Sequence, residues 1–593
     1  MLSDGLIGGY FSPSEPLWHR RLTSLFAGVI FVACSALIIE YGFYPSAFVI
    51  TVLHFVELTT TILVCLIKLG LLITAARPRQ YLASHWVDYA LLFTLVTQVF
   101  VYLELRQTTE FQYLEVRGLH FSILTAYTVV VQLGLVILLA IESPIFHRAL
   151  VRLKLHPARS FLLSFAAIIL AGALLLCLPK SVTSGRTLSF VDALFTATSA
   201  VCVTGLTVVD TGTHFSLMGK SIILVLIQVG GLGIFTFTAF LAVLLGRGLA
   251  PDEAQTVGGW LNVDMLARLT RTVRTILAVT FLVEASGAIF LYIDWADEIP
   301  NAFDRAFSSV FHSVSAFCNA GFGLFPDNLT RFVAAPVTNL TIMGLIILGG
   351  LGFEVLTELV KLATLRKRLA ECSLHTLLVV PMTLFLIASG AVLMLVTEQS
   401  NMLQPAGTGE RVWASLFQSV TLRTAGFNTV DFTRLLSVTA LWMIVFMAIG
   451  GSPGSTAGGV KTTTVSILIA ALKRRLTRVS TPMTIYRRRL TPGSVRRAFT
   501  VMSLFVATAI LLTGGLVVIE PLAALPLAFE TVSALGTVGL SLGITASLSA
   551  IGKVILIIAM FIGRIGPLTI GIAVTGRDTP EAPAHEGERV LIG

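Results

Sequence analysis

Charged side chains are scarce in this sequence. Asp, Glu, Lys and Arg make up 12% of the 593 residues, about half of their share in an ordinary soluble domain. Hydrophobic residues make up 55%, and the mean hydropathy is +0.88. Because the apolar residues come in long runs, the composition argues against a soluble multidomain enzyme and indicates a protein whose solvent is a lipid bilayer.

Cysteine is also rare, and no two cysteines are spaced as a CxxC pair. The wide spacing argues against a zinc site or a disulfide framework. The six cysteines are Cys34, Cys65, Cys177, Cys202, Cys318 and Cys372. A small-residue cleavage pattern is missing from the first apolar run, which begins near Thr23, so we expect this run to be a retained helix and not a signal peptide.

Twelve apolar runs are long enough to span a bilayer. They cover about residues 23–40, 48–76, 87–104, 119–142, 161–178, 220–245, 275–293, 337–362, 376–397, 436–472, 499–519 and 551–575. Every second connecting loop is basic, and the loops between them carry acids. The positive-inside rule therefore predicts twelve spans in the cell membrane with both termini in the cytoplasm, and it accounts for the net charge of +9 without nucleic acid as a partner.

Four shorter apolar segments lie in the acidic loops, and none is long enough to span. They are residues 190–204, 302–319, 413–424 and 522–536. Irregular backbone at membrane depth is tolerated only where it lines a cavity or is buried in protein, so these segments are predicted to be re-entrant.

Each re-entrant segment shares a pattern of aromatic, hydroxyl and glycine residues. The aligned glycines are Gly205, Gly321, Gly426 and Gly539, at separations of 116, 105 and 113 residues. The chain therefore repeats a helix, a short helix, a loop and a helix four times, so one chain could build a fourfold pore.

Cation binding would explain why glycine stands at the four aligned positions. A cation that leaves water needs oxygen dipoles in place of its hydration shell. Backbone carbonyls supply them if successive C=O groups point at one axis, which requires backbone angles that glycine adopts without steric cost. The C-terminal end of each short helix adds favourable negative potential.

The glycine-centred segments carry a family resemblance. Residues 203–207 (VTGLT), 319–323 (NAGFG), 424–428 (TAGFN) and 537–541 (TVGLS) resemble the TVGYG filter of potassium channels. With the phrases TATSAVCVTGLTVVDTG and LIQVGGLGIFTF, the chain resembles the superfamily of K⁺ transporters that comprises the bacterial Ktr and Trk membrane subunits and the plant HKT proteins. The Ktr-type membrane subunit is the most similar type, and the resemblance covers about residues 160–575.

The resemblance implies an all-α integral membrane fold. Four tandem helix–pore-loop–helix repeats would form a pseudo-fourfold pore like that of a K⁺ channel, preceded by about four extra transmembrane helices. K⁺ would bind at the filter carbonyls of Val203, Thr204, Gly205, Asn319, Ala320, Gly321, Thr424, Ala425, Gly426, Thr537, Val538 and Gly539. A serine at the first glycine position goes with Na⁺ preference in some plant members, so Gly205 implies K⁺.

The apolar run over 436–472 is interrupted by the Gly-rich stretch 450–464, which is too polar for a continuous helix. Such a stretch is expected inside a membrane only where it lines a pore. The resemblance implies an intramembrane gating loop below the filter, contacted by Arg564 of the last span. The gating residues are then Gly450, Gly451, Ser452, Gly454, Gly458, Gly459, Lys461 and Arg564. A merely kinked helix and an arginine that snorkels to the cytoplasm are the alternatives.

The repeat also predicts the domain organisation. Residues 1–150 would hold N-terminal transmembrane helices of unknown role, without the regularly spaced basic residues of a voltage sensor in the fourth of them. Pore repeats 1 to 4 would follow, and then a disordered tail. Their ranges are 151–260, 261–370, 371–478 with the gating loop, 479–577 and 578–593 for the tail.

The leading hypothesis is potassium uptake driven by the membrane potential, without enzymatic activity. The resemblance implies Na⁺ dependence, a homodimer and a cytosolic nucleotide-binding regulatory ring of the KtrA/TrkA-like type. In this chain GGLG at 230–233 lacks the spacing of a nucleotide site, so no cofactor is expected beyond K⁺ as cargo and Na⁺ as activator. The alternatives are a Trk-type subunit with different ion coupling and an organic-solute transporter, which would have inverted repeats.

Overall fold

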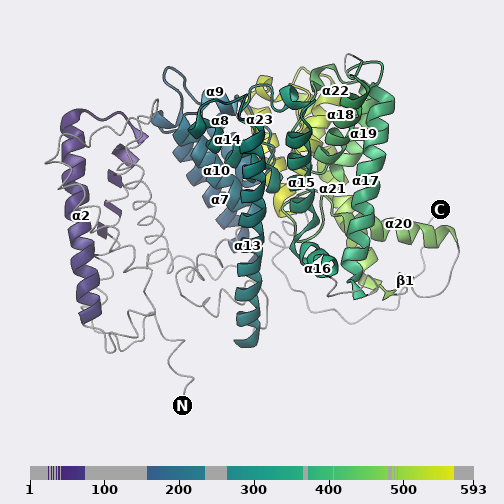
Figure 1. Cartoon of the computed structure of the whole chain (residues 1–593), viewed down its shortest axis with the longest axis horizontal. Coiled ribbons are helices and arrows are strands. Elements are labelled where there is room, and N and C mark those ends of the chain that lie inside the picture. Colours follow the sequence, from purple (N-terminus) through teal and green to yellow (C-terminus); the bar gives the residue numbers. More distant parts are fainter. Residues whose placement is uncertain are drawn as a thin grey trace.

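The computed structural model of the chain describes residues 42–73, 157–233, 263–364, 371–404, 407–477, 484–490 without 487, and 492–566, with scattered residues between 25 and 40. The described chain is mostly helical (Figure 1). The only sheet among these residues is a hairpin of two short strands, β1 (Thr484–Ile485) and β2 (Arg488–Arg489). The expectation of an all-α membrane protein is confirmed at this level.

The helices follow one another in sets of three, each with a first helix, a short helix and a second helix (Figure 1). The sets are α7 (Pro157–Leu176), α8 (Phe190–Val201) and α10 (Leu217–Leu232); α13 (Val263–Asp294), α14 (Ala302–Phe317) and α15 (Pro336–Leu351); α17 (Leu374–Glu398), α18 (Thr408–Thr421) and α19 (Ser437–Ala448); and α21 (Pro492–Ile519), α22 (Ala524–Gly536) and α23 (Ala550–Ile565). Between them lie α9 (Thr211–His214), α16 (Phe353–Ala363), α20 (Thr462–Leu476) and the 3₁₀ turns η1 (Pro179–Ser181), η2 (Thr330–Phe332), η4 (Phe432–Arg434) and η5 (Thr545–Ser547).

Three described helices are long and apolar enough to cross a membrane. They are Thr275–Asp294, Leu374–Glu398 and Gly493–Ile519. The four short helices α8, α14, α18 and α22 have 12, 16, 14 and 13 residues. At 1.5 Å per residue they are too short to span a hydrocarbon core of about 30 Å.

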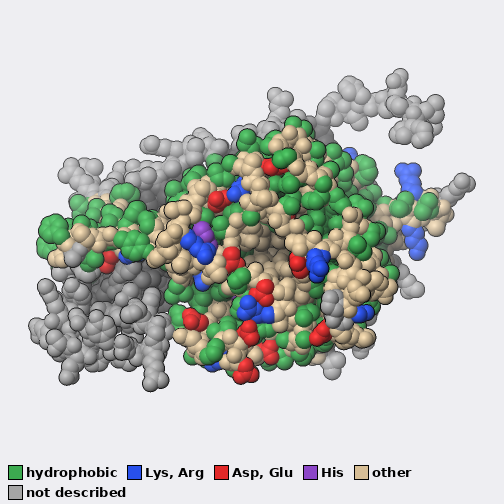
Figure 2. Space-filling model, turned by 90° about the horizontal axis from the view of Figure 1, so that it is seen from above, with side chains coloured by type: hydrophobic (Ala, Val, Ile, Leu, Met, Phe, Trp, Pro, Cys, Tyr) green, Lys and Arg blue, Asp and Glu red, His purple; other side chains and the backbone are tan. Residues whose placement is uncertain are grey.

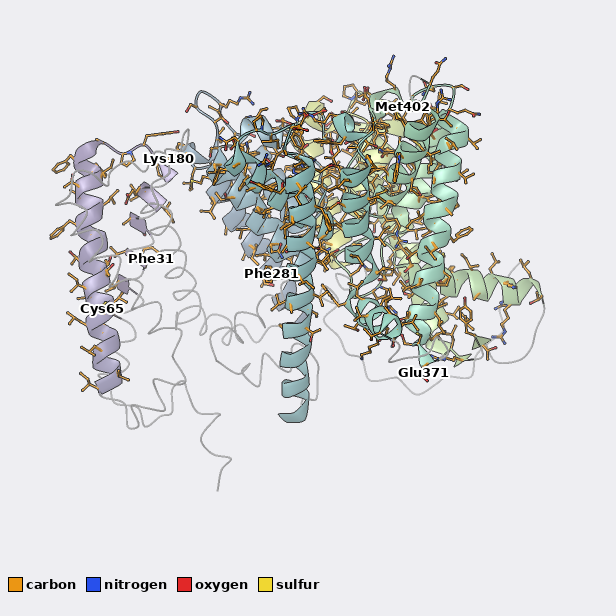
Figure 3. All side chains as sticks on the ribbon, viewed as in Figure 1. Phe31, Cys65, Lys180, Phe281, Glu371 and Met402 are labelled. Atoms are coloured by element: carbon orange, nitrogen blue, oxygen red, sulfur yellow. The ribbon has the colours of Figure 1, made fainter. Side chains whose placement is uncertain are left out.

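The N-terminal spans are only partly visible. The second predicted span is represented by α2 (Ala47–Ile73), whereas the third and fourth lie outside the described residues. The predicted domain boundaries also fall in, or at the edge of, segments that the structure does not describe. Near the start of α2, the Lys180 ammonium donates to the Glu40 carbonyl oxygen at 2.6 Å, so the turn η1 after α7 meets the N-terminal segment (Figure 3).

One predicted span is wrong as a continuous helix. The apolar run over 337–362 is broken at Gly352, and α15 and α16 meet there at an angle of 110°. Gly352 has φ +87°, a left-handed conformation that favours glycine. The Phe353 N–H donates to the Gly454 carbonyl oxygen at 3.3 Å, so the N-terminus of α16 is tied to a distant loop.

Buried side chains join each set to its neighbours. One cluster packs Phe195 of the first set together with Leu535 and Met560 of the fourth, and it closes the bundle on itself. Outward-facing positions carry apolar side chains instead, as Phe281 does on α13, where half of its surface is exposed (Figure 3). An apolar outer surface around a packed interior is typical of a bundle in lipid.

The ends of the long helices are fastened by buried or half-buried acids. The Glu398 carboxylate accepts from the Leu436 N–H and from the Thr439 hydroxyl, at the start of α19. The Glu520 carboxylate accepts from the N–H and the hydroxyl of Ser549, at the start of α23. In both sets the acid therefore satisfies backbone donors that the next helix leaves unpaired.

The ion pair that joins the first and fourth sets should contribute to stability. The Lys553 ammonium lies 2.7 Å from the Asp192 carboxylate, and both side chains are largely buried. We expect Asp192→Asn and Lys553→Met each to lower the apparent Tm in detergent, with a coupling energy of about 1 kcal/mol in the double-mutant cycle. Strictly additive losses would show that the pair contributes nothing.

Candidate functional site

The chain leaves each short helix through a tight left-handed turn. The three residues that follow, 203–205, 319–321, 424–426 and 537–539, are called the glycine segments below. Their first and third residues have positive φ: Val203 (+57°), Asn319 (+59°), Thr424 (+64°) and Thr537 (+51°), then Gly205 (+91°), Gly321 (+71°), Gly426 (+77°) and Gly539 (+92°). The middle residue of each segment lacks a positive φ, so the sign of φ alternates along the three residues.

The four glycines lie against one another in a closed cycle, called the glycine ring below. A Cβ added at Gly321 would lie 2.7 Å from the Ala425 carbonyl oxygen, and one added at Gly426 would lie 2.7 Å from that of Val538. Gly205 faces the Ala320 carbonyl in the same manner, and Gly539 faces that of Thr204. Each segment therefore contacts the next in chain order, and the fourth contacts the first.

Hydroxyl groups at the ends of the short helices hold the segments from behind. The Gly205 N–H donates to the Ser199 hydroxyl at 3.0 Å, and the Gly539 N–H donates to the Ser533 hydroxyl at 3.1 Å. Because these N–H groups are satisfied behind the segment, the carbonyl oxygens remain available on the other side.

In the second and third segments the hydroxyl of the short helix is the donor, and a backbone carbonyl is the acceptor. The Ser315 hydroxyl donates to the Phe322 carbonyl oxygen at 2.8 Å, and the Thr421 hydroxyl donates to that of Phe427 at 2.6 Å. The hydroxyl thus fixes the residue after the glycine in these two segments, and the N–H of the glycine itself in the other two. All four ties lie in the buried interior.

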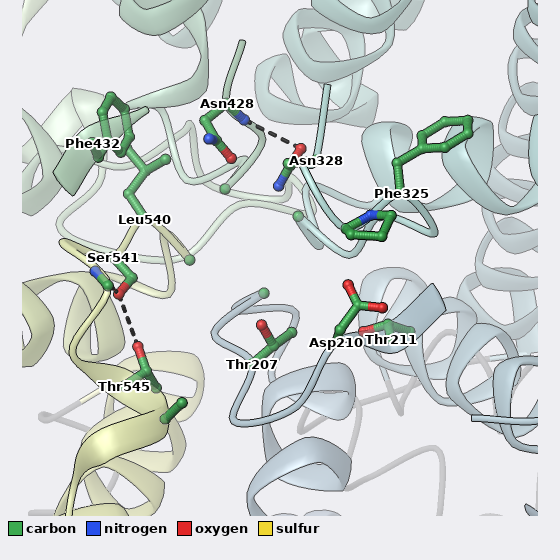
Figure 4. A pocket seen from close by; sticks show the side chains of 18 of the residues that line it. Thr207, Asp210, Thr211, Phe325, Asn328, Asn428, Phe432, Leu540, Ser541 and Thr545 are labelled. Carbon is green, nitrogen blue, oxygen red and sulfur yellow. Dashed lines mark hydrogen bonds between the residues drawn. The ribbon is translucent and has the colours of Figure 1, made fainter. Parts of the chain in front are cut away.

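A cavity of about 280 Å³ opens on one side of the glycine ring (Figures 2 and 4). All four ring glycines line it, together with residues that follow them, such as Thr207 and Ser541. The carboxylates of Asp210 and Asp431 and the amides of Asn328 and Asn428 also line the cavity. Oxygen atoms and negative charge at its wall favour a cation.

The rim carries one acid whose ionisation is fixed by its neighbours. Burial would raise the pKa of Asp327, but hydrogen bonds from Arg331 and Thr330 outweigh it and hold that pKa below its usual value. Arg331 donates to both Asp327 oxygens and also bonds Glu298. Asp327 is therefore ionised at neutral pH, next to the cavity-lining Asn328.

The predicted gating loop lies on the opposite side of the glycine ring. Residues 449–461, called the intramembrane loop below, connect α19 and α20 without helix. Thr456 donates to the Phe317 carbonyl oxygen at 3.1 Å, just before the second glycine segment. A Cβ on Gly458 would collide with the Thr537 hydroxyl at the start of the fourth segment. The loop thus contacts the residues that precede the glycines, and the cavity contacts those that follow.

Backbone hydrogen bonds dock the loop on the end of α15. The Ser452 N–H donates to the Gly350 carbonyl oxygen at 3.0 Å, and the Thr456 N–H donates to that of Gly349 at 3.2 Å. The Ser452 hydroxyl also donates to the carbonyl oxygens of Gly350 and Leu351. The broken end of α15, whose carbonyls lack helical partners, therefore receives the loop.

The loop's own glycines take part in this backbone pairing. Gly450 donates to the Val460 carbonyl oxygen at 2.9 Å, and the Gly451 carbonyl oxygen accepts from the Thr462 N–H at 3.1 Å. Gly454 and Gly459 have φ +70° and +66°, which side-chain-bearing residues rarely adopt. A continuous kinked helix over this stretch is thereby excluded.

Two of the predicted gating residues are cations. The Arg564 guanidinium donates to the carbonyl oxygens of Thr456 in the loop and of Gly230 at the end of α10. The Lys461 ammonium donates within the loop, to the Ala457 carbonyl oxygen at 2.6 Å. Arg564 therefore ties the loop to the first set, and it points into the protein instead of snorkelling.

Arg423 is a site residue that sequence reasoning missed. Only 6% of its surface is exposed, and its guanidinium donates to the Gly450 carbonyl oxygen of the loop at 3.4 Å. The Asn319 amide donates to the Arg423 carbonyl oxygen at 3.2 Å. The sequence does contain a signal for Arg423. The residue directly before the first and second glycine segments is an uncharged cysteine, Cys202 or Cys318, whereas the residue directly before the third is this arginine.

A second missed signal is the motif Gly-x-x-Gly at the end of three second helices. It occupies 230–233, 349–352 and 563–566. The first glycine of each motif packs on the last turn of a short helix, where a Cβ would collide with the carbonyls of Val201, Phe317 and Leu535 respectively. The second glycine has positive φ and ends the helix. GGLG at 230–233 is thus a packing motif.

Apolar helices that enclose the glycine ring define an all-α integral membrane protein. A family model described as TrkH, cation transport protein, matches residues 164–577. The chain belongs to this family.

The relatives have consistent names. The chain is 39% identical to Ktr system potassium uptake protein B of Bacillus subtilis over 421 residues, covering 70% of this chain and 92% of the relative. It is 39% identical to the Vibrio alginolyticus protein of the same name, covering 73% and 94%. It is 35% identical to the potassium/sodium uptake protein NtpJ of Enterococcus hirae, covering 71% and 93%.

A solved structure supports the fold. The potassium transporter TrkH from Vibrio parahaemolyticus superimposes with a TM-score of 0.59 at 18% identity, covering 82% of this chain and 97% of that one. Together with the apolar helices, the family membership makes this chain a multi-pass membrane protein.

Loss of the Arg564 guanidinium should loosen the intramembrane loop. Hydrogen bonds to charged groups contribute about 1.5–3 kcal/mol each, so we expect Arg564→Gln to speed amide hydrogen exchange over 450–461 by about tenfold or more. Hydrogen–deuterium exchange with mass spectrometry would measure this. Arg331→Gln, at the exposed rim, is the control and should leave the loop unchanged; equal exchange in all three proteins would contradict the tether.

Proposed function

We propose that this chain is the membrane subunit of a potassium uptake system of the Ktr type. The closed cycle of the four ring glycines is the observation that carries the proposal, because it aligns carbonyl oxygens from four segments of one chain. A ring of carbonyls replaces the hydration shell of a dehydrated cation. The names of the relatives, which are potassium uptake proteins, support K⁺ as this cation.

In this proposal the twelve residues of the glycine segments form a selectivity filter within a pseudo-fourfold pore. K⁺ collects in the cavity beside Asp210 and Asp431, loses water at the ring and passes inward. The membrane potential drives the movement, worth about 2.3 kcal/mol per charge per 100 mV. One glycine per segment, in place of the two in TVGYG, predicts only modest preference for K⁺ over Na⁺.

The intramembrane loop is the proposed gate. It lies on the side of the ring opposite the cavity. Hydrogen bonds restrain most of it, and Val460 near its end packs in the buried core. Such bonds can be exchanged for bonds to water once the loop moves into a hydrated cavity, so displacement of the loop costs less than unfolding a helix.

The proposed assembly and regulation are inferred from the similarity to the relatives. We propose that the chain forms a homodimer and is activated by Na⁺. We also propose that a cytosolic nucleotide-binding ring acts on the intramembrane loop from the side of the membrane that carries the basic loops. The support is the similarity to subunits of Ktr systems and to a potassium/sodium uptake protein. Both termini would then lie in the cytoplasm.

Transport by the purified chain tests the proposal. We expect liposomes that contain the chain to take up ⁸⁶Rb⁺ under an imposed inside-negative potential, with K⁺ as competitor. The test is repeated with added soluble partner and with varied external Na⁺. No uptake under any of these conditions would reject potassium transport.

Substitution of Gly205 should weaken uptake. A side chain at φ +91° is strained, and its Cβ would lie 3.0 Å from the Gly321 Cα. We expect Gly205→Ser to lower K⁺-competed uptake by about tenfold or more, since left-handed strain alone costs about 1–2 kcal/mol. Gly185→Ser is the matched control, because Gly185 has φ +82° but open space around it. Equal uptake by the two variants would refute the filter assignment.

Release of the loop should raise basal uptake. Arg423→Gln and Arg564→Gln each remove a cation that binds a loop carbonyl. We expect each variant to take up ⁸⁶Rb⁺ several-fold faster than the wild type without the soluble partner, and Arg331→Gln to match the wild type. Uptake that is unchanged or slower in both folded variants would contradict gating by this loop.

A further inference from the structure

The helix α20 leaves the bundle sideways. It lies across the direction of α17 and projects from the body of the protein (Figure 1), and its basic end stands clear of the bundle when seen from above (Figure 2). It contacts α17 and α21. Its axis runs across that of α17, which is long and apolar enough to span a membrane.

The projecting half of α20 is apolar along one face. Ile469, Leu472 and Leu476 are 52%, 61% and 75% exposed. Their spacing of three and four residues places them on the same face. This face continues the apolar outer surface of the neighbouring helices, where Phe385 on α17 and Phe499 on α21 are 62% and 66% exposed.

Basic side chains flank that apolar face. Lys473 and Arg475 are exposed on the last turn of α20. Nine basic residues and no acid occur between positions 473 and 497. The end of α20 therefore carries the exposed cations Lys473 and Arg475 next to exposed apolar side chains.

We propose that α20 binds anionic lipid headgroups through Lys473 and Arg475. Its apolar face would lie at the boundary between headgroups and acyl chains, in the leaflet on the side of the basic loops. Helices that lie in the membrane interface combine these two features. Each basic residue near such a surface is worth about 1 kcal/mol with anionic lipids. A symmetric contact of this end with a second copy would bring the basic patches of both copies together. An acidic soluble partner would neutralise the cations but leave Leu472 and Leu476 in water.

The test measures lipid contact directly and does not depend on transport. Ile469→Trp places a reporter on the apolar face, and its fluorescence is compared with that of the parent in vesicles that contain brominated phosphatidylglycerol or brominated phosphatidylcholine. We expect stronger quenching by the brominated phosphatidylglycerol. In the same background, Lys473→Gln with Arg475→Gln should remove this preference, by up to about fivefold in relative affinity per charge.

A charge-matched control uses exposed arginines of the opposite loops. Arg186→Gln with Arg434→Gln should keep the preference for phosphatidylglycerol. Raised salt should weaken the preference in the unmutated basic background, which tests the electrostatic part without any change to α20. Equal quenching by both brominated lipids would overturn the proposal, as would absence of quenching together with crosslinking of position 469 to a second copy or to a soluble partner.

Discussion

Four stretches of backbone can meet at one point only if no side chain stands between them. Gly205, Gly321, Gly426 and Gly539 provide that point, and a Cβ on any of them would collide with the adjacent segment. The rest of the architecture follows from this constraint. The short helices must end at the ring, and their hydroxyls must hold the segments from behind. Long helices must then enclose the whole arrangement, because irregular backbone in a bilayer has to be buried in protein or to line a cavity.

The ring was accessible from sequence because its determinants are local. The segment predicted to start at residue 190 becomes α8 at Phe190–Val201, and the one predicted over 522–536 becomes α22 at Ala524–Gly536. The break at Gly352 was not accessible, because hydropathy runs on through it and the partner of the Phe353 N–H lies about a hundred residues away, at Gly454. Arg423 was visible as a lone cation, but only the fold places it on the loop.

A single chain with four similar sets can make each set different, which identical subunits cannot do. The intramembrane loop belongs to the third set alone in the described chain, and the two guanidiniums that hold it come from the third and fourth sets. The first and second sets contribute carbonyl acceptors at the ends of α10 and α15. Each set thus contributes a distinct part of one asymmetric site, although all of them share the glycine segment.

The loop and the ring have hydrogen bonds in common, and this links their states. Asn319 belongs to a glycine segment; its amide donates to the Arg423 carbonyl oxygen, and its side-chain oxygen lies 3.4 Å from the Thr456 hydroxyl of the loop. Arg423 in turn reaches Gly450 at the start of the loop. A displacement that carries Thr456 and Gly450 away therefore removes a bond from the second glycine segment and one from the residue that precedes the third. On the proposed function, the carbonyl geometry that selects the ion relaxes whenever the gate opens, so permeation and selectivity rest on the same residues.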